Sequence, residues 1–272
     1  MKKTIIVAAI AAVMVTSISS YAATNINQKA SNESTQNLAV ESNSAEVTNN
    51  QEKSNGNIEY TKMTFTTEKD GASDITETWV NPKTFDFRQD IIRSSVESES
   101  EIPKTGDAEK DAMNAKKMAA AANAPKYTST YFENSGKQIV NIIRDDNGNP
   151  IKGNKDDAPQ EEANSNVQNI QKNQTFAAMK SLYANPADWK DEGTETTSDG
   201  KVLKKISSGD KNGEEMHLLY LNEDGLPVKS ELYINGQLAG VGTMEYKLVQ
   251  DDGKIFDTSG VQLEPLNIDR SK

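Results

Sequence analysis

Residues 219–236 read LYLNEDGLPVKSELYING, and this stretch decides the fold. Two runs rich in aliphatic, aromatic and β-branched residues flank Glu223-Asp224-Gly225, and the second run ends in Asn235-Gly236. Asp-Gly and Asn-Gly dipeptides between such runs are the strongest short-range signal for a β-hairpin. The stretch therefore predicts strands over 215–221 and 228–234, followed by a third over 237–249.

The same rhythm extends upstream. Lys69-Asp70-Gly71 separates two strand-like runs, and Asn81-Pro82 breaks the second of them. A turn at 198–200 separates another pair, whereas the polar run 145–157 is expected to be a loop. We expect the remaining strands of an antiparallel meander at 58–67, 75–80, 84–92, 127–132, 139–143, 193–197 and 202–207.

One segment has the periodicity of an amphipathic helix. Apolar and small residues recur at spacings of three and four over 166–184, and Asn185-Pro186 ends the pattern. The apolar side of such a helix must be buried, and the rest of the chain offers only a sheet. The predicted fold class is therefore mainly β (α+β), an antiparallel sheet with one or two covering helices.

The N-terminus has the pattern of a secretory signal peptide over residues 1–22. Lys2 and Lys3 precede an apolar stretch over 5–18, and Ser20 and Ala22 supply small residues before a cleavage site. We expect a secreted, extracytoplasmic protein with no transmembrane span in the mature chain, because the apolar stretch is shorter than the roughly 20 residues that cross a bilayer. Retention of the segment as an uncleaved anchor is the alternative.

Composition divides the rest of the chain. Residues 23–57 are polar and are expected to be a disordered leader, because they cannot bury enough apolar surface to offset the entropy of ordering. A single β domain is expected over 58–265, with an insertion at 93–126 that contains an alanine-rich, exposed helix. Residues 266–272 form a C-terminal tail.

Charge and cysteine content exclude several classes of function. The formal net charge of −11 disfavours nucleic acid as a partner, since phosphate binding needs clustered Lys and Arg. The chain has no cysteine, which removes disulfides, thiolate nucleophiles and sulfur metal sites.

Residues that could carry chemistry are few. The single histidine, His217, lies in an apolar strand without a Gly-x-Ser-x-Gly elbow, and one histidine is too few for a zinc site. Asp145-Asp146-Asn147-Gly148-Asn149 is the wrong register for an EF-hand, because the loop would begin at Ile143 and end at Asn154, so a turn is predicted. Gly236, Gly240 and Gly242 indicate strand curvature or a bulge. We therefore expect no enzymatic activity, no cofactor and no metal.

The 219–236 hairpins resemble the C-terminal hairpins of the LolA-like group, which includes bacterial lipoprotein carriers and clostridial GerS-like germination proteins. Residues 60–79 are similar to the opening strands of that group, and 256–265 to its closing segment. The resemblance implies a strongly curved antiparallel sheet, an incomplete β-barrel, with helices on its concave side.

The resemblance also implies two functions. In lipoprotein carriers the concave face is apolar and receives acyl chains, whereas GerS-like members associate with a peptidoglycan amidase during sporulation and germination. This chain departs from the GerS-like pattern because it has no lipid-anchor cysteine and carries a polar leader and an insertion.

We favour a non-enzymatic module that binds an envelope protein over a carrier of a lipid or acyl chain. An aromatic content of 6% and a mean hydropathy of −0.72 argue against a large apolar cavity. The alternatives for the apolar residues are a binding face or simply the core. The candidates for the apolar face of the sheet and helix are Phe65, Trp79, Phe87, Tyr131, Ile142, Phe176, Met179, Leu182, Leu219, Leu232 and Tyr246.

Overall fold

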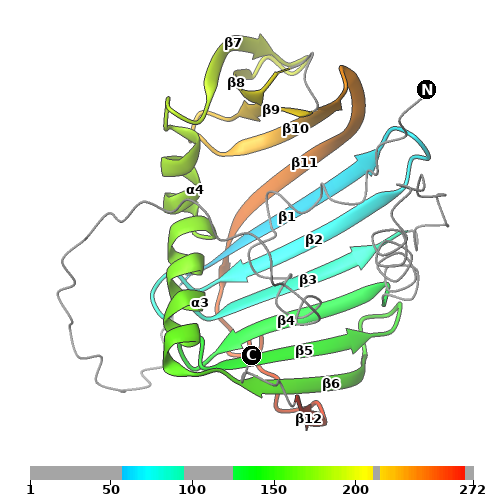
Figure 1. Cartoon of the computed structure of the whole chain (residues 1–272), viewed down its shortest axis with the longest axis vertical. Helices are drawn as coiled ribbons and strands as arrows, with labels where there is room; N and C mark the ends of the chain where they lie inside the picture. Colours follow the sequence, from blue (N-terminus) through cyan, green and yellow to red (C-terminus); the bar gives the residue numbers. More distant parts are fainter. Residues whose placement is uncertain (1–56, 95–124, 211–214, 267–272) are drawn as a thin grey trace, which may run out of the picture.

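A computed structural model describes residues 57–94, 125–210 and 215–266. Within these residues the chain forms one twelve-stranded sheet and two helices (Figure 1). The elements are β1 (Asn57–Thr67), β2 (Ser73–Val80), β3 (Phe87–Arg93), β4 (Tyr127–Glu133), β5 (Gln138–Arg144), β6 (Pro150–Asp157), α3 (Gln160–Asn173), α4 (Phe176–Tyr183), β7 (Lys190–Thr196), β8 (Val202–Gly209), β9 (Glu215–Leu221), β10 (Pro227–Ile234), β11 (Gln237–Gln250) and β12 (Leu263–Pro265).

The strand order is β12-β6-β5-β4-β3-β2-β1-β11-β10-β9-β8-β7. Neighbouring strands are antiparallel except β12, which lies parallel to β6. The sheet is open and curved, with β7 and β12 at its edges, so it is an incomplete barrel (Figure 1). The predicted mainly β fold class is confirmed.

The hairpins predicted from 219–236 form as expected. The side-chain oxygen of Asn222 accepts hydrogen bonds from the backbone of Asp224 and Leu226, which closes the first turn. In the second turn, Asn235 and Gly236 have φ values of 49° and 77°. Positive φ at both central residues is the backbone geometry of the type I′ turn that Asn-Gly favours.

A bulge lies where the glycines of β11 predicted an irregularity. Leu232 is opposite Gly240, but Tyr233 is opposite Leu238, which leaves Ala239 as the extra residue. A Cβ at Gly240 would overlap the ring of Phe65. Glycine is therefore needed here because a neighbouring ring lies directly on the backbone.

The single helix predicted over 166–184 is wrong, because the structure has two helices that meet at Gln174 and Thr175. Thr175 has extended backbone angles (φ −81°, ψ 152°), and its side chain accepts a hydrogen bond from the amide of Ala178, 3.1 Å away. A threonine that caps a new helix in this way interrupts the previous one. α3 also begins earlier than predicted, at Gln160.

The loop predicted over 145–157 is also wrong in its second half. Residues from Pro150 form β6, which pairs with β5 along almost its whole length. The composition of β6 is polar, and strand formation here depends on pairing with a neighbour rather than on intrinsic propensity.

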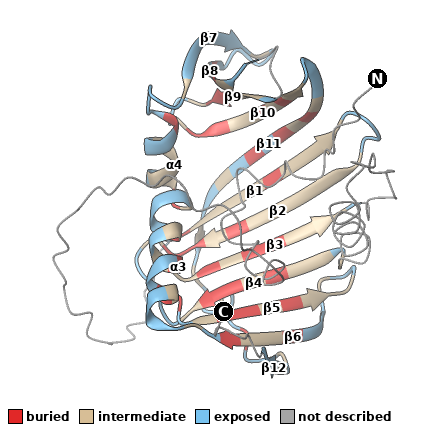
Figure 2. Ribbon diagram, in the orientation of Figure 1, coloured by how far each residue is buried: buried red, intermediate tan, exposed pale blue. Residues whose placement is uncertain are grey.

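The helices and the C-terminal segment cover opposite faces of the sheet. On one side, which we call the helix face, Ile170 of α3 packs against Val80, Phe87, Phe132 and Ile139. Figure 2 shows buried segments in the strands that lie beside α3.

α4 covers a second part of the helix face. Tyr183 packs there with Ile206, Leu219 and Leu221, and Met179 and Trp189 lie against the same cluster. On the helix face, the middle of strands β1 to β6 belongs to neither of these two apolar clusters.

On the other side, which we call the strap face, residues 251–266 run from the end of β11 to the far edge of the sheet. We call this segment the strap. Its Ile255 carbonyl accepts a hydrogen bond from Arg88, and its Thr258 hydroxyl donates to Glu133.

Several predicted regions lie outside the described residues. These are the signal peptide (1–22), all of the polar leader except residue 57, residues 95–124 of the insertion, and residues 267–272 of the tail. Neither α3 nor α4, the helices of the described ranges, has the length and apolar character needed to cross a membrane.

Candidate functional site

The eleven candidate apolar residues do not share one face. Residues opposite each other in a sheet point to the same side, and successive residues alternate. Trp79 is opposite Arg88, and Arg88 is opposite Tyr131. Ile142 is opposite Ser129, which lies two residues before Tyr131 in β4 and so points to the same side. These three lie on the strap face, whereas the helix face carries Phe65, Phe87, Leu219, Leu232 and Tyr246, and α4 supplies Phe176, Met179 and Leu182.

On the helix face the candidates are part of separate packing contacts. Phe87 lies under α3, and Leu219 lies under α4. The rings of Phe176 and Tyr246 meet edge to face, with centroids 5.4 Å apart. Leu182 is 40% exposed. Apart from the exposed Leu182, these candidates therefore belong to separate packing contacts rather than to one continuous apolar lining.

On the strap face the three candidates contact polar or strap residues. The guanidinium of Arg88 lies 4.6 Å from the centroid of the Trp79 ring. Tyr131 and Ile142 form a cluster with Val140 that the strap covers.

A row of uncharged polar side chains crosses the helix face beside the apolar residues under α3. The register places each member directly opposite the next, from β1 to β6, so the side chains stand about 4.8 Å apart across the sheet. We call this set the polar row, and its members are Thr61, Thr78, Gln89, Thr130, Asn141 and Asn154.

The hydrogen bonds within the polar row are incomplete. The Thr130 hydroxyl donates to the Asn141 side-chain oxygen at 2.9 Å, and Gln89 donates to Thr78 at 3.5 Å. The Asn154 side-chain oxygen is buried and has no hydrogen-bond partner within the described part of the chain. The row can therefore both donate and accept hydrogen bonds. The polar row is not recognisable in the sequence, because only the register of the strands brings these residues into line.

Glu59 marks the end of the helix face where α4 begins. Its carboxylate accepts a hydrogen bond from the backbone amide of Phe176, the first residue of α4, at 2.7 Å. Burial raises the pKa of Glu59, against the lowering effects of the Phe176 amide and the charge of Lys180. The strand thus supplies an acidic cap to a helix that is far away in sequence.

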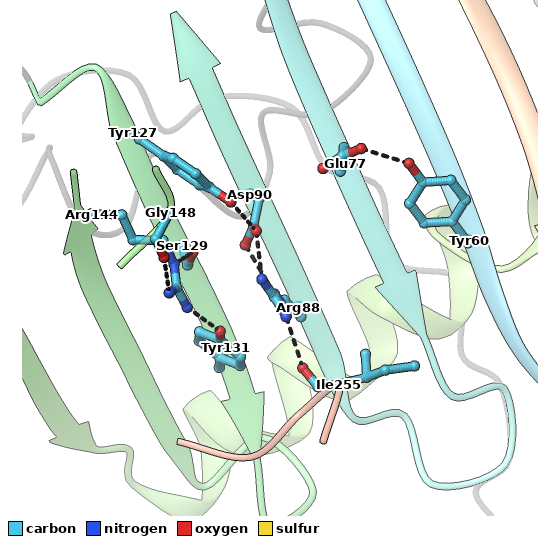
Figure 3. Close-up of polar contacts among 10 residues, drawn as sticks. All are labelled: Tyr60, Glu77, Arg88, Asp90, Tyr127, Ser129, Tyr131, Arg144, Gly148 and Ile255. Atoms are coloured by element: carbon cyan, nitrogen blue, oxygen red, sulfur yellow. Dashed lines mark hydrogen bonds and ion pairs between the residues drawn. The ribbon is translucent and has the colours of Figure 1, made fainter. Parts of the chain in front are cut away.

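The strap face carries a network of charged and phenolic groups (Figure 3). Arg88 and Asp90 form a bidentate pair, with nitrogen–oxygen distances of 3.0 and 2.6 Å, and the Tyr127 hydroxyl also donates to Asp90. Arg144 donates to the hydroxyl oxygens of Ser129 and Tyr131. Burial and the charge of Asp90 raise the pKa of Tyr127 to about 12, so this phenol stays protonated.

The other residues that could carry chemistry, His217 and Asp145, make contacts with neighbouring residues of the fold. The His217 imidazole lies 2.6 Å from a carboxylate oxygen of Glu215. The Asp145 carboxylate accepts hydrogen bonds from the amides of Asn147 and Asn149, which closes the predicted turn. In the described ranges, no three histidine, aspartate or glutamate residues are grouped as a metal site would require.

Comparison with known proteins finds similarity only among solved structures. No family model and no curated protein sequence matches the chain. The chain is similar to an uncharacterized conserved protein from Thermus thermophilus, with 10% identity, a TM-score of 0.38, and coverage of 79% of this chain and 94% of that chain.

Two further solved structures are similar in the same way. MucB in the Pseudomonas aeruginosa MucA/MucB complex is 11% identical, with a TM-score of 0.36 and coverage of 78% of this chain and 59% of that chain. A DUF1329 family protein from Desulfovibrio piger is 10% identical, with a TM-score of 0.27 and coverage of 77% and 93%. At these scores the likeness supports no argument about what this chain binds.

Proposed function

We propose that this chain is a non-enzymatic, extracytoplasmic protein of the bacterial envelope that binds another envelope protein through the helix face. The observation that carries the proposal is the polar row. Gln89 and Thr78 are buried, at 1% and 8% exposure, so the half-buried members Thr61, Thr130, Asn141 and Asn154 supply the hydroxyl and amide groups that can exchange hydrogen bonds with a polypeptide surface.

The polar row also weighs against the carrier alternative. An acyl chain needs a contiguous apolar lining, because burying unpaired hydroxyl and amide groups against hydrocarbon costs free energy. The apolar side chains beside the row, such as Phe87 and Phe132, are already in contact with Ile170 of α3. An acyl chain on this part of the helix face would lie on Thr130 and Asn141.

Native mass spectrometry of the protein, purified gently from a bacterial host, separates the two functions. The protein-binding function predicts a clean mass. A persistent extra mass that is lost on organic extraction would favour a lipid carrier and contradict the proposal.

Site-specific photo-crosslinking in the native envelope then tests the surface. A photoreactive side chain at Asn141 should capture a discrete protein, whereas the same side chain at the exposed Lys247, on the strap face, should not. T130A/N141A should reduce the capture by a probe at Thr61 without a large change in melting temperature. Equal capture from Asn141 and Lys247 would argue against the helix face.

The identity of the partner is a narrower proposal, which rests on the LolA-like resemblance. A GerS-like role would make the partner a peptidoglycan amidase in sporulation or germination. Identifying the captured protein by peptide mass spectrometry tests this role directly, and capture of a protein without amidase activity would contradict it.

A further inference from the structure

The strap forms the edge of the sheet with only a short strand. β12 pairs with β6 over three residues, from Leu263 opposite Gly153 to Pro265 opposite Lys155. One more hydrogen bond joins the Leu266 amide to the Lys155 carbonyl, at 2.7 Å. β12 therefore pairs with only three of the eight residues of β6 and leaves residues 150–152 beyond its end. The edge of β6 is therefore long enough for a longer strand than β12.

The strap's apolar anchors occupy a defined place on the strap face. Val261 and Leu263 pack against the cluster of Tyr131, Val140 and Ile142. Gly153 creates the space, because a Cβ there would stand 2.5 Å from Leu263 Cδ2 and 3.1 Å from Val261 Cγ1. The site thus accepts an extended segment with apolar residues at positions i and i+2.

The upstream part of the strap places carboxylates near carboxylates. Burial raises the pKa of Glu133, and the charges of Asp86 and Asp257 raise it further, while the hydrogen bond from Thr258 lowers it. Burial likewise raises the pKa of Asp86, the Thr84 hydroxyl lowers it, and the charge of Asp251 raises it. Asp251 and Asp257 both belong to the strap, so their charges oppose its position beside Asp86 and Glu133, whereas the hydrogen bond from Thr258 to Glu133 supports it.

We propose that the outer edge of β6 and the Tyr131–Val140–Ile142 cluster form a strand-accepting site for a partner protein, and that the strap occupies this site in the free molecule. The preferred partner segment is extended, has apolar residues at i and i+2, and carries a basic residue where the strap has Asp257. The Tyr131–Val140–Ile142 cluster is on the opposite face from Thr130 and Asn141, the members of the polar row that the crosslinking experiment tests, so failure of the strand-accepting site would leave the proposed function standing.

Two physical arguments support displacement of the strap. An exposed strand edge is a ready template for an added strand, which gains main-chain hydrogen bonds along its length. A basic residue in place of Asp257 converts its repulsion of Glu133 into attraction at the same position. A partner strand can therefore gain hydrogen bonds along the rest of β6 and a charge contact that the strap lacks.

Binding of a fluorescent peptide to the full-length protein tests the proposal. The peptide has the sequence of residues 254–266, and binding is measured by fluorescence polarisation to the unaltered protein and to V261S/L263S, which removes both apolar anchors of the strap. The control is Q262S/E264S, which alters the two exposed strap residues next to the anchors.

The expected result is binding to V261S/L263S that is at least about tenfold tighter than binding to the unaltered protein or the control, because each ~1.4 kcal/mol of lost apolar contact is a factor of ten. A peptide with serine in place of Val261 and Leu263 should not bind. A peptide carrying D257K should bind about threefold more tightly at low salt and lose this advantage at high salt.

Equal binding to V261S/L263S and the unaltered protein, with circular dichroism showing both to be folded, would overturn the proposal. So would equal binding of the serine-substituted peptide. If V261S/L263S does not fold, hydrogen exchange of the G153A variant replaces it. Displacing Leu263 should speed exchange of the Leu266 amide at least about tenfold, and an unchanged rate would overturn the proposal.

Discussion

Glu59 and Phe176 are separated by 117 positions in the sequence, yet the Glu59 carboxylate accepts a hydrogen bond of 2.7 Å from the Phe176 amide. Together with the Thr175 cap, this contact fixes where α4 begins on the helix face. The first strand of the sheet therefore sets the start of the second helix.

Replacing Glu59 should loosen α4. We expect E59A to lower the free energy of unfolding by about 1 kcal/mol, the usual contribution of an N-terminal helix cap. Chemical denaturation measures the change, and E245A, at an exposed position on the strap face, is the matched control. An E59A variant as stable as E245A would show that Thr175 alone is sufficient as the cap.

Burial of Glu133, together with the like charges of Asp86 and Asp257, predicts a pH dependence of stability. The pKa of Glu133 is raised in the folded state, so the folded protein holds this proton more tightly than the unfolded chain does. Its contribution to stability is complete below the unfolded pKa and is lost as the pH rises through the folded pKa. E133Q, which is neutral at every pH, should therefore gain melting temperature relative to the unaltered protein between about pH 4 and pH 7. A constant difference between the two proteins across that range would contradict this cause.

The stability of the protein should be sensitive to replacement of the acidic residue in the Arg88–Asp90 pair on the strap face. Asp90 is 1% exposed and makes a bidentate contact with Arg88. We expect D90N to destabilise the protein by about 3 kcal/mol, because Arg88 would remain partly buried without a counter-charge. The double variant R88M/D90N should recover part of this loss in thermal or chemical unfolding. No recovery would mean that the contacts of Arg88 with Trp79 and Ile255 contribute more than its charge costs.

Gly240 should not tolerate a side chain. G240A would force the Phe65 ring off β11 and cost about 1–3 kcal/mol, as overpacking does elsewhere. The control is G260A in the strap, where an added Cβ meets no atom within 4 Å. Adding F65A should remove only part of the cost of G240A, because the new Cβ would still stand 2.8 Å from the Thr66 carbonyl oxygen, and full additivity of the two changes would argue against a direct contact with Phe65.

The sequence was sufficient to predict those parts of the structure that depend on residues close together in the chain. Asn222-Gly225 and Asn235-Gly236 close their turns with their own side chains and backbone, so the hairpins of β9, β10 and β11 were predictable. The break at Thr175 was not, because it involves Glu59 on a distant strand as well as a local cap.

The sequence also could not show on which face of the sheet each strand residue lies. Trp79 and Val80 are adjacent, and both are apolar, but the half-buried Trp79 and the buried Val80 lie on opposite sides of the sheet, so apolar character alone could not assign a side. The polar row has the same origin, since six residues from six strands are brought into line by register alone. β6 was missed because its polar residues become a strand only through pairing with β5.

The position of β1 has a consequence for the order of folding. β1 lies in the middle of the sheet, between β2 and β11, and Asn57 is paired with Gln250. As the chain emerges from its N-terminus, β1 to β6 can assemble hairpin by hairpin, but one side of β1 stays open until β11 arrives. Contacts between such distant residues form slowly, because a long loop must close first. Until nearly the whole chain has emerged, the backbone groups on one edge of β1 therefore have no partner strand. This central edge is where a chaperone would protect the unfinished sheet most.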